Sequence, residues 1–206
     1  MTNKDFEKAM TELCNNLSRK GLKMSNASRD GRVNSIADEK TVIAAIKEIL
    51  TESDYDEVPE RSMEDIRIYG RPVNIKVTGL KGRDNVSSNE GLVYALTGRK
   101  PSASNWPAIG ETLDSNDIDK DADYYFLVVN KKDPADIFWT SFKQLKVGYP
   151  NGSNLPFQVK WEENRERIQR TYEEAWEFLT GLLLKSAELR LLPHSIIKEV
   201  KEKHGR

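Results

Sequence analysis

The 206-residue chain has very little cysteine and no long apolar run, and each shortage excludes a class of protein. Cys14 is the only cysteine, so no internal disulfide can form and a zinc site built from thiolates is not expected. No stretch of about 18 apolar residues occurs, so we expect no membrane span. The first residues also lack the apolar segment of a signal peptide. Together these features predict a soluble, cytoplasmic protein.

Two further shortages narrow the possible chemistry. His194 and His204 are the only histidines, and neither has a second metal ligand at a useful spacing, so both are set aside as metal ligands. A Ser/His/Asp hydrolase would need a histidine elsewhere, and the missing glycine-rich phosphate loop argues against an ATPase. The net charge of −1 gives no overall attraction to nucleic acid. Basic residues nevertheless gather between 67 and 99, and acidic residues between 111 and 123 in what reads as a solvated loop. One surface could therefore be basic.

Hydrophobic periodicity predicts a mixed α/β protein. In chain order we expect helices over 4–18 and 39–51, a strand pair over 65–78, a helix over 91–98, an irregular segment over 101–123, strands over 124–130, 136–142 and 157–161, and helices over 162–190 and 195–203. The second helix is expected to start near Ser35 or Asp38, either of which could cap it. The strands over 124–130 and 136–142 are expected to be central. This order predicts an α/β fold with a central mixed sheet flanked by helices.

One domain is the default for a chain of this length. We divide it into an N-terminal helix and arm at 1–35, a core at 36–161 and C-terminal helices at 162–206.

The strand pair over 65–78 is the most informative stretch of the sequence. Strand side chains switch faces at every residue, so Asp65, Asn74 and Lys76 can share one face while the aliphatic residues between them enter the core. A carboxylate and an amide oxygen can hold a hard cation such as Mg²⁺, and a nearby lysine can orient a water or stabilise charge on a phosphate. The pattern therefore indicates metal-dependent cleavage of a phosphodiester. An edge hairpin with one wet face fits the same alternation.

Three features follow one another along the chain: a helix with Glu39 near its start, the hairpin with Asp65 and Asn74-Ile-Lys76, and an apolar strand followed by a long C-terminal helix. This order resembles type II restriction endonucleases of the PD-(D/E)XK superfamily, in the EcoRV/HincII-like branch. The resemblance implies a restriction-endonuclease-like core, a Mg²⁺ cofactor and a homodimer that cuts double-stranded DNA at a short palindrome. It further implies that Asp65 is the principal metal ligand, that Lys76 positions the attacking water and that Glu39 is an auxiliary acid. Glu39 also fits an ordinary first-turn glutamate that favours the helix dipole.

Asn74 is where the chain departs from that family, which usually has Asp or Glu at this position. An amide oxygen can ligate Mg²⁺, but it carries no charge and cannot act as a base. Three explanations stay open: a natural variant site, a site helped by Glu39 or Glu64, or a change from Asp to Asn that traps uncut DNA. Asn74 also favours an alternative function, a catalytically impaired or non-catalytic DNA-binding protein on the same fold. A structure-specific repair nuclease is a further alternative.

Two polar loops after the hairpin carry side chains suited to DNA. Arginine suits guanine O6 and N7, asparagine suits adenine N6 and N7, and serine and lysine suit phosphates. The expected contacts come from Lys81, Arg83, Asn85, Ser87 and Ser88 in the first loop and from Ser102, Ser104 and Asn105 in the second. Plain solvent-exposed loops would have a similar composition.

Overall fold

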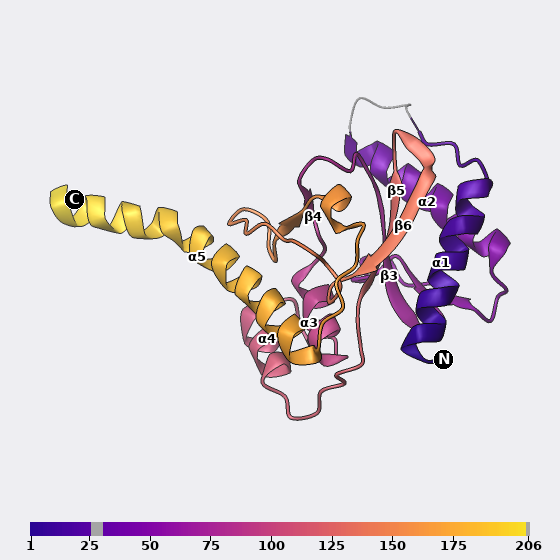
Figure 1. Ribbon diagram of the computed structural model, residues 1–206. Coiled ribbons are helices and arrows are strands. Elements are labelled where there is room, and N and C mark those ends of the chain that lie inside the picture. The colour runs from indigo at the N-terminus through magenta and orange to yellow at the C-terminus, as the bar shows by residue number, and fades with distance from the viewer. Residues whose placement is uncertain (26–30, 205–206) are drawn as a thin grey trace.

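A five-stranded mixed sheet, flanked by helices, lies at the centre of the protein (Figure 1). The structure is a computed structural model that describes residues 1–25 and 31–204. The strands, in spatial order, are β1 (Tyr55–Asp56), β2 (Ile66–Ile68), β3 (Arg71–Thr78), β5 (Tyr125–Asn130) and β6 (Asp133–Ser141). Strands β3 and β5 run parallel, and the other neighbours run antiparallel. The mixed α/β architecture that the hydrophobic periodicity predicted is confirmed.

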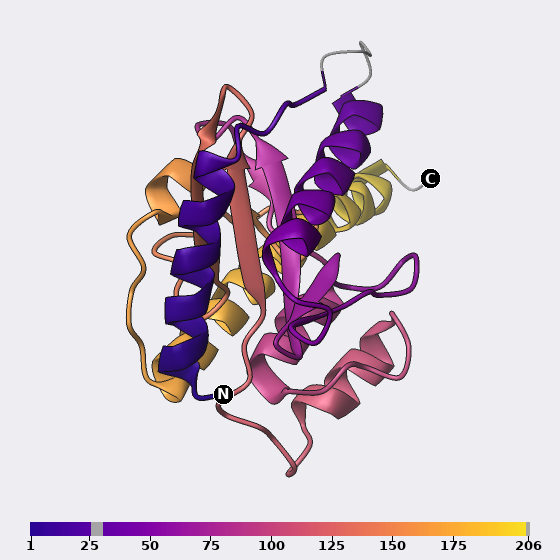
Figure 2. The ribbon, with the colours of Figure 1, turned by 90° about the vertical axis from the view of Figure 1, so that its right-hand side faces the viewer.

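Two N-terminal helices, α1 (Asn3–Arg19) and α2 (Gly31–Ile49), cover one face of this sheet (Figure 2). The apolar side chains that predicted the first helix are all buried against the strands: Phe6, Met10, Leu13 and Leu17. The strand residues that face α1 and α2 belong to the same hydrophobic core as these helix residues. The helical spacing therefore predicted both α1 and the face that it buries.

The second face carries α3 (Asn89–Thr97), α4 (Trp106–Leu113), a short ribbon of β4 (Asp84–Asn85) with β7 (Gln158–Val159), the 3-10 turn η1 (Trp161–Asn164) and the first half of α5 (Tyr172–His204). An aromatic core lies beneath them, formed by Tyr124, Phe126, Phe142, Phe157 and Trp161. The second half of α5 projects away from the rest of the molecule (Figure 1). Strand β5 is buried on both faces except at Asn130, which agrees with its continuous apolar sequence.

The predicted first residues of two helices, the second helix and the long C-terminal helix, were wrong. Helix α2 begins at Gly31, and Asp38 lies within it, where the buried Asp38 carboxylate binds Lys131 Nζ at 2.7 Å instead of capping the helix. Helix α5 begins at Tyr172, because Thr171 and Glu174 form reciprocal hydrogen bonds of 2.8 and 3.2 Å, the arrangement of a capping box. The two expected C-terminal helices are one, since α5 continues through Pro193.

Two further expectations need correction. The segment 101–123 is not wholly irregular, because Asn105 caps α4 by accepting the Ala108 N–H at 3.0 Å. Strand β6 starts at Asp133 and lies at the edge of the sheet, not at its centre. An edge strand tolerates Pro134 because its outward N–H positions need no partner strand.

The predicted hairpin is confirmed. Tyr69 and Gly70 connect β2 to β3 with φ angles of 49° and 76°. Positive φ at both central residues is the conformation of a two-residue turn that matches the twist of the strands. The turn therefore determines the register of β2 against β3.

Candidate active site

The pairing of β2 with β3 brings Asp65 beside Asn74. Ile66 lies opposite Val73, so the preceding residue, Asp65, faces Asn74. The Asp65 Oδ2 atom accepts the Ile75 N–H at 2.6 Å. The aliphatic residues of both strands pack against the N-terminal helices: Ile66, Ile68, Val73, Ile75 and Val77. As the alternation predicted, Asp65, Asn74 and Lys76 lie on the other face of the hairpin.

The carboxylate of Asp65 has an electrostatic environment suited to a cation. Burial raises its pKa above the ordinary value, and the charge of Glu64 raises it further. The hydrogen bond from Ile75 and the positive charge of Lys76 act in the opposite direction but do not cancel the effect of burial. A cation beside Asp65 would therefore compensate an unfavourable negative charge.

Asn74 supplies a second oxygen whose hydrogen-bonding capacity is unused. Its Oδ1 atom is buried and has no hydrogen-bond partner among the described residues. An unsatisfied buried acceptor destabilises a protein by roughly 1–3 kcal/mol. The described residues hold four other buried side-chain polar atoms in the same condition, on Asn89, Thr140, Ser141 and Gln144. The donor set of Asp65 and Asn74, two hard oxygens on one face, thus fits a cation such as Mg²⁺.

The side chain of Tyr124 lies beside Asp65 and Asn74, and sequence reasoning missed it. Its hydroxyl donates to the Met63 carbonyl and lies 3.3 Å from Ser87 Oγ. Burial raises the pKa of Tyr124, while the hydrogen bond from Ser87 and the neighbouring Asn74 amide act to lower it. No sequence signal could have identified this neighbour, because Tyr124 precedes an apolar strand some fifty residues after the hairpin.

Glu39 and Lys76 line one cavity of about 330 Å³, at the end of β3. Thr78, Asp84 and Lys131 also contribute to its wall, whereas Asp65 and Asn74 do not. Glu39 lies in the middle of α2, so its reading as a first-turn glutamate is wrong. Glu39 of the helix therefore shares a cavity with Lys76, whereas Asp65 of the hairpin lies beside Asn74.

Glu64 is paired with a cation from its own hairpin. Arg67 binds Glu64 Oε1 through Nε at 2.9 Å and Nη2 at 2.8 Å, and Glu64 is buried. Within residues 1–25 and 31–204, no three His, Cys, Asp or Glu side chains form a group that could hold a metal. A cation at the hairpin would thus rely on one carboxylate, one amide oxygen, and water or phosphate.

Most of the expected DNA-contacting serines and asparagines have local structural partners. Ser88 caps α3 by accepting the Gly91 N–H at 3.2 Å, and Asn105 caps α4. Ser87 contacts Tyr124, and Ser104 donates to Glu90. The remaining expected contacts, Lys81, Arg83, Asn85 and Ser102, have exposed side chains. Ser88, Ser104 and Asn105 are exposed as well, so Ser87 is the one partly buried member of the predicted interface.

The expected basic surface is smaller than the sequence indicated. Arg67 is paired with Glu64, Arg99 binds Asp117 at 3.0 Å, and the Arg71 guanidinium lies 4.7 Å from the centre of the Phe6 ring. The exposed cations of this stretch are Lys81, Arg83 and Arg99, and Arg99 is bound to Asp117.

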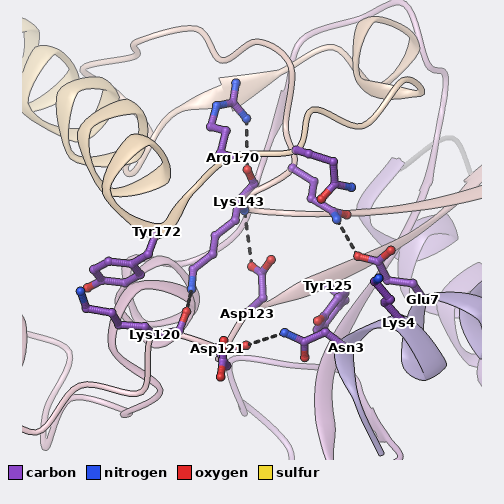
Figure 3. Close-up of a pocket in the computed structure, with 12 residues that line it drawn as sticks. Asn3, Lys4, Glu7, Lys120, Asp121, Asp123, Tyr125, Lys143, Arg170 and Tyr172 are labelled. Carbon is purple, nitrogen blue, oxygen red and sulfur yellow. Dashed lines mark hydrogen bonds between the residues drawn. The ribbon is translucent and has the colours of Figure 1, made fainter.

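A second cavity, of about 630 Å³, lies at the start of β5 beside α1 and the beginning of α5 (Figure 3). Burial raises the pKa of Asp123 to about 6 and lowers that of Lys143. The Asp123 carboxylate accepts the N–H of Tyr124 at 2.8 Å, and Lys143 Nζ donates to the Lys120 carbonyl at 2.8 Å. The acidic run is exposed at Glu111, Asp114, Asp117, Asp119 and Asp121, as a solvated loop should be, but Asp123 is the exception. These groups hold the loop against the end of β6.

Comparisons with known proteins add no relative. No protein-family model matches the chain, and no curated protein is similar to it. No described helix is long and apolar enough to cross a membrane.

Proposed function

We propose that the chain is a type II restriction endonuclease with a restriction-endonuclease-like core. It would use Mg²⁺ to hydrolyse phosphodiester bonds of double-stranded DNA at a short palindrome, with each subunit of a homodimer cutting one strand. The observation that carries the proposal is that Asp65, the unpartnered oxygen of Asn74 and Lys76 share one face of the hairpin. The cavity that Lys76 shares with Glu39 supports the same assignment.

Asp65 and Asn74 would hold the cation. When bound, Mg²⁺ polarises a phosphate and lowers the pKa of a water. Mg²⁺ commonly uses one or two protein carboxylates together with waters and substrate phosphates, so a single carboxylate and an amide oxygen are a sufficient protein share. The ammonium group of Lys76 would orient the attacking water and stabilise negative charge on the phosphate. Glu39, which lines the same cavity as Lys76, would be the auxiliary acid.

The proposal is tested by incubating the purified protein with phage DNA and Mg²⁺ and separating the products on a gel. Discrete fragments are expected from the wild type. Asp65→Ala and Lys76→Ala should each abolish cutting while a gel-shift assay still detects DNA binding. Asp114→Ala, which removes an exposed carboxylate far along the chain, is the matched control and should cut normally. Undiminished cutting by Asp65→Ala would exclude the site.

A DNA-binding protein without catalytic activity is the second candidate. The favouring observation is that the hairpin offers one carboxylate where Asn74 replaces a second. In the same assay such a protein would shift DNA but leave it intact in both Mg²⁺ and Mn²⁺. A smear of fragments would instead indicate a nuclease without sequence preference, as expected of the repair alternative.

A further inference from the structure

The ribbon of β4 and β7 holds its residues firmly beside the candidate active site. Trp161 Nε1 donates to Asp84 Oδ2 at 2.8 Å, and the Val86 N–H donates to the Phe157 carbonyl at 3.3 Å. Val86 and Val159 are fully buried beneath the ribbon. Asp84 also lines the cavity that contains Lys76, so the backbone of β4 borders that cavity, while the side chain of the next residue, Asn85, points to the other face of the strand.

Asn85 and Gln158 form a hydrogen-bonded pair of side-chain amides on the outer side of this ribbon. They are opposite one another in the β4–β7 pairing, and Gln158 Nε2 donates to Asn85 Oδ1 at 3.1 Å. Asn85 is exposed and Gln158 is half-buried. The bond leaves the Asn85 NH₂ group and the Gln158 carbonyl oxygen without another side-chain partner in the part of the chain that the structure describes. Exchanging O and N in both amides would reverse the bond but leave the same complement, one donor and one acceptor.

Cationic side chains flank the amide pair. The Arg83 guanidinium lies 4.5 Å from the centre of the Tyr149 ring, and Lys160 Nζ lies 5.3 Å from it. Tyr149 is itself attached to the ribbon, because its backbone exchanges hydrogen bonds of 2.7 and 2.9 Å with Gln158. Figure 1 shows β4 between the central sheet and α5. The Glu163 carboxylate belongs to the same group, because it accepts from the Tyr149 hydroxyl and binds Lys160 Nζ at 3.0 Å. The exposed positive charge beside the amide pair therefore comes from Arg83. An arginine beside an ordered polar pair suits a surface that contacts phosphates and bases together.

We infer that Asn85 and Gln158 jointly read one adenine in the major groove of the DNA substrate, an inference that rests on the proposed function. A two-stranded ribbon fits the major groove, where adenine presents the N7 acceptor next to the N6 amino donor. The Asn85 NH₂ group donates to N7, and the Gln158 carbonyl accepts from the amino group. Guanine presents two acceptors there, thymine an acceptor and a methyl group, and cytosine a donor, so the donor and acceptor pair matches adenine alone.

The test begins with the recognition sequence of the wild type. That sequence is determined from its cleavage products, or by selecting randomised duplexes that bind Lys76→Ala in Ca²⁺. Duplexes are then made in which each adenine of the site is replaced in turn by 7-deazaadenine, which lacks the N7 acceptor. Wild type should lose roughly tenfold in affinity at one such position in each half-site of the palindrome. Asn85→Ala should bind natural and 7-deaza duplexes equally, and both Asn85→Ala and Gln158→Ala should lose the preference for adenine there. Asn154→Ala, which removes an exposed amide from a neighbouring loop, should retain it.

The outcomes separate the inference from the function on which it depends. If the wild type selects a sequence but Asn85→Ala and Gln158→Ala select the same one with unchanged adenine preference, the inference is wrong and the proposed function stands. If the wild type neither cuts nor binds DNA, the proposed function fails and the inference fails with it. Melting temperatures close to that of the wild type are required of each variant, so that lost recognition is not lost folding.

Discussion

Asn74→Asp should destabilise the protein in the absence of metal. The change adds a second carboxylate to the face that Asp65 occupies, and Asp65 already has a raised pKa because of burial. Side chains directly opposite one another on antiparallel strands have Cβ atoms about 4.5–5.5 Å apart. Two unit charges about 5 Å apart repel by about 3 kcal/mol at an effective dielectric constant near 20. For a chain of this size, such a loss lowers the melting temperature by roughly 6–12 °C.

The loss should depend on pH and on divalent cations. The added carboxyl has a higher pKa in the folded state than in the unfolded state, so its penalty is absent below about pH 4 and complete at pH 7. Under the proposed function, Mg²⁺ at about 100 times its dissociation constant should restore about 2.7 kcal/mol. The variant should also cut DNA faster than the wild type, because the second ligand now carries charge.

Thermal unfolding followed by circular dichroism, at pH 4 and pH 7 and with or without Mg²⁺, measures these effects. Asn154→Asp is the control, since the same change in an exposed loop should move the melting temperature little. If Asn74→Asp has the same melting temperature as the wild type at pH 7 without metal, residues 65 and 74 do not share a partly buried face. The reasoning for a cation site then fails.

Four other predictions concern the rest of the molecule. Burial raises the pKa of the Cys14 thiol to about 12, so iodoacetamide at pH 8 should modify it only in denaturant; rapid modification of the native protein would contradict its burial. Burial raises the pKa of Asp123 to about 6, so Asp123→Asn should have a higher melting temperature than the wild type above pH 6. The difference in melting temperature should vanish below about pH 4. A constant difference across pH would argue against titration of this group. Gly181→Ala, in an open position within α5, should stabilise the protein by up to about 1 kcal/mol in urea unfolding. Gly152→Ala should destabilise it, because the added Cβ would lie 2.8 Å from the Leu189 backbone, and equal stability of the two glycine variants would contradict that close approach.

Local patterns in the sequence were enough to predict several elements and part of the site. The alternation around Asp65, Asn74 and Lys76 predicted both the hairpin and the face these side chains share, because side-chain direction in a strand depends only on residue parity. Helical spacing predicted α1, and Gly98, with φ of 71°, ends α3 as expected. These features are decided within a few residues of chain.

Element boundaries were predicted less well, since competing local signals exist. Aspartate favours the N-cap position, yet Asp38 lies within α2, where its buried carboxylate binds Lys131 from a distant turn. The true start of α5 carried a capping-box signal at Thr171 and Glu174 that the hydrophobic pattern concealed. Such choices depend on which of two plausible local structures gains a tertiary partner.

The environment of the site was decided by tertiary structure alone. The parallel alignment of β5 with β3 puts Tyr124 behind Asn74, and the packing of α2 brings Glu39 to the cavity of Lys76. Strands β4 and β7 have only two residues each, too short for any periodicity, and their amide pair joins residues 73 positions apart. Contacts between residues far apart in the chain leave no repeating pattern in the sequence, so burial, pairing and unpartnered polar atoms emerge only when the elements pack.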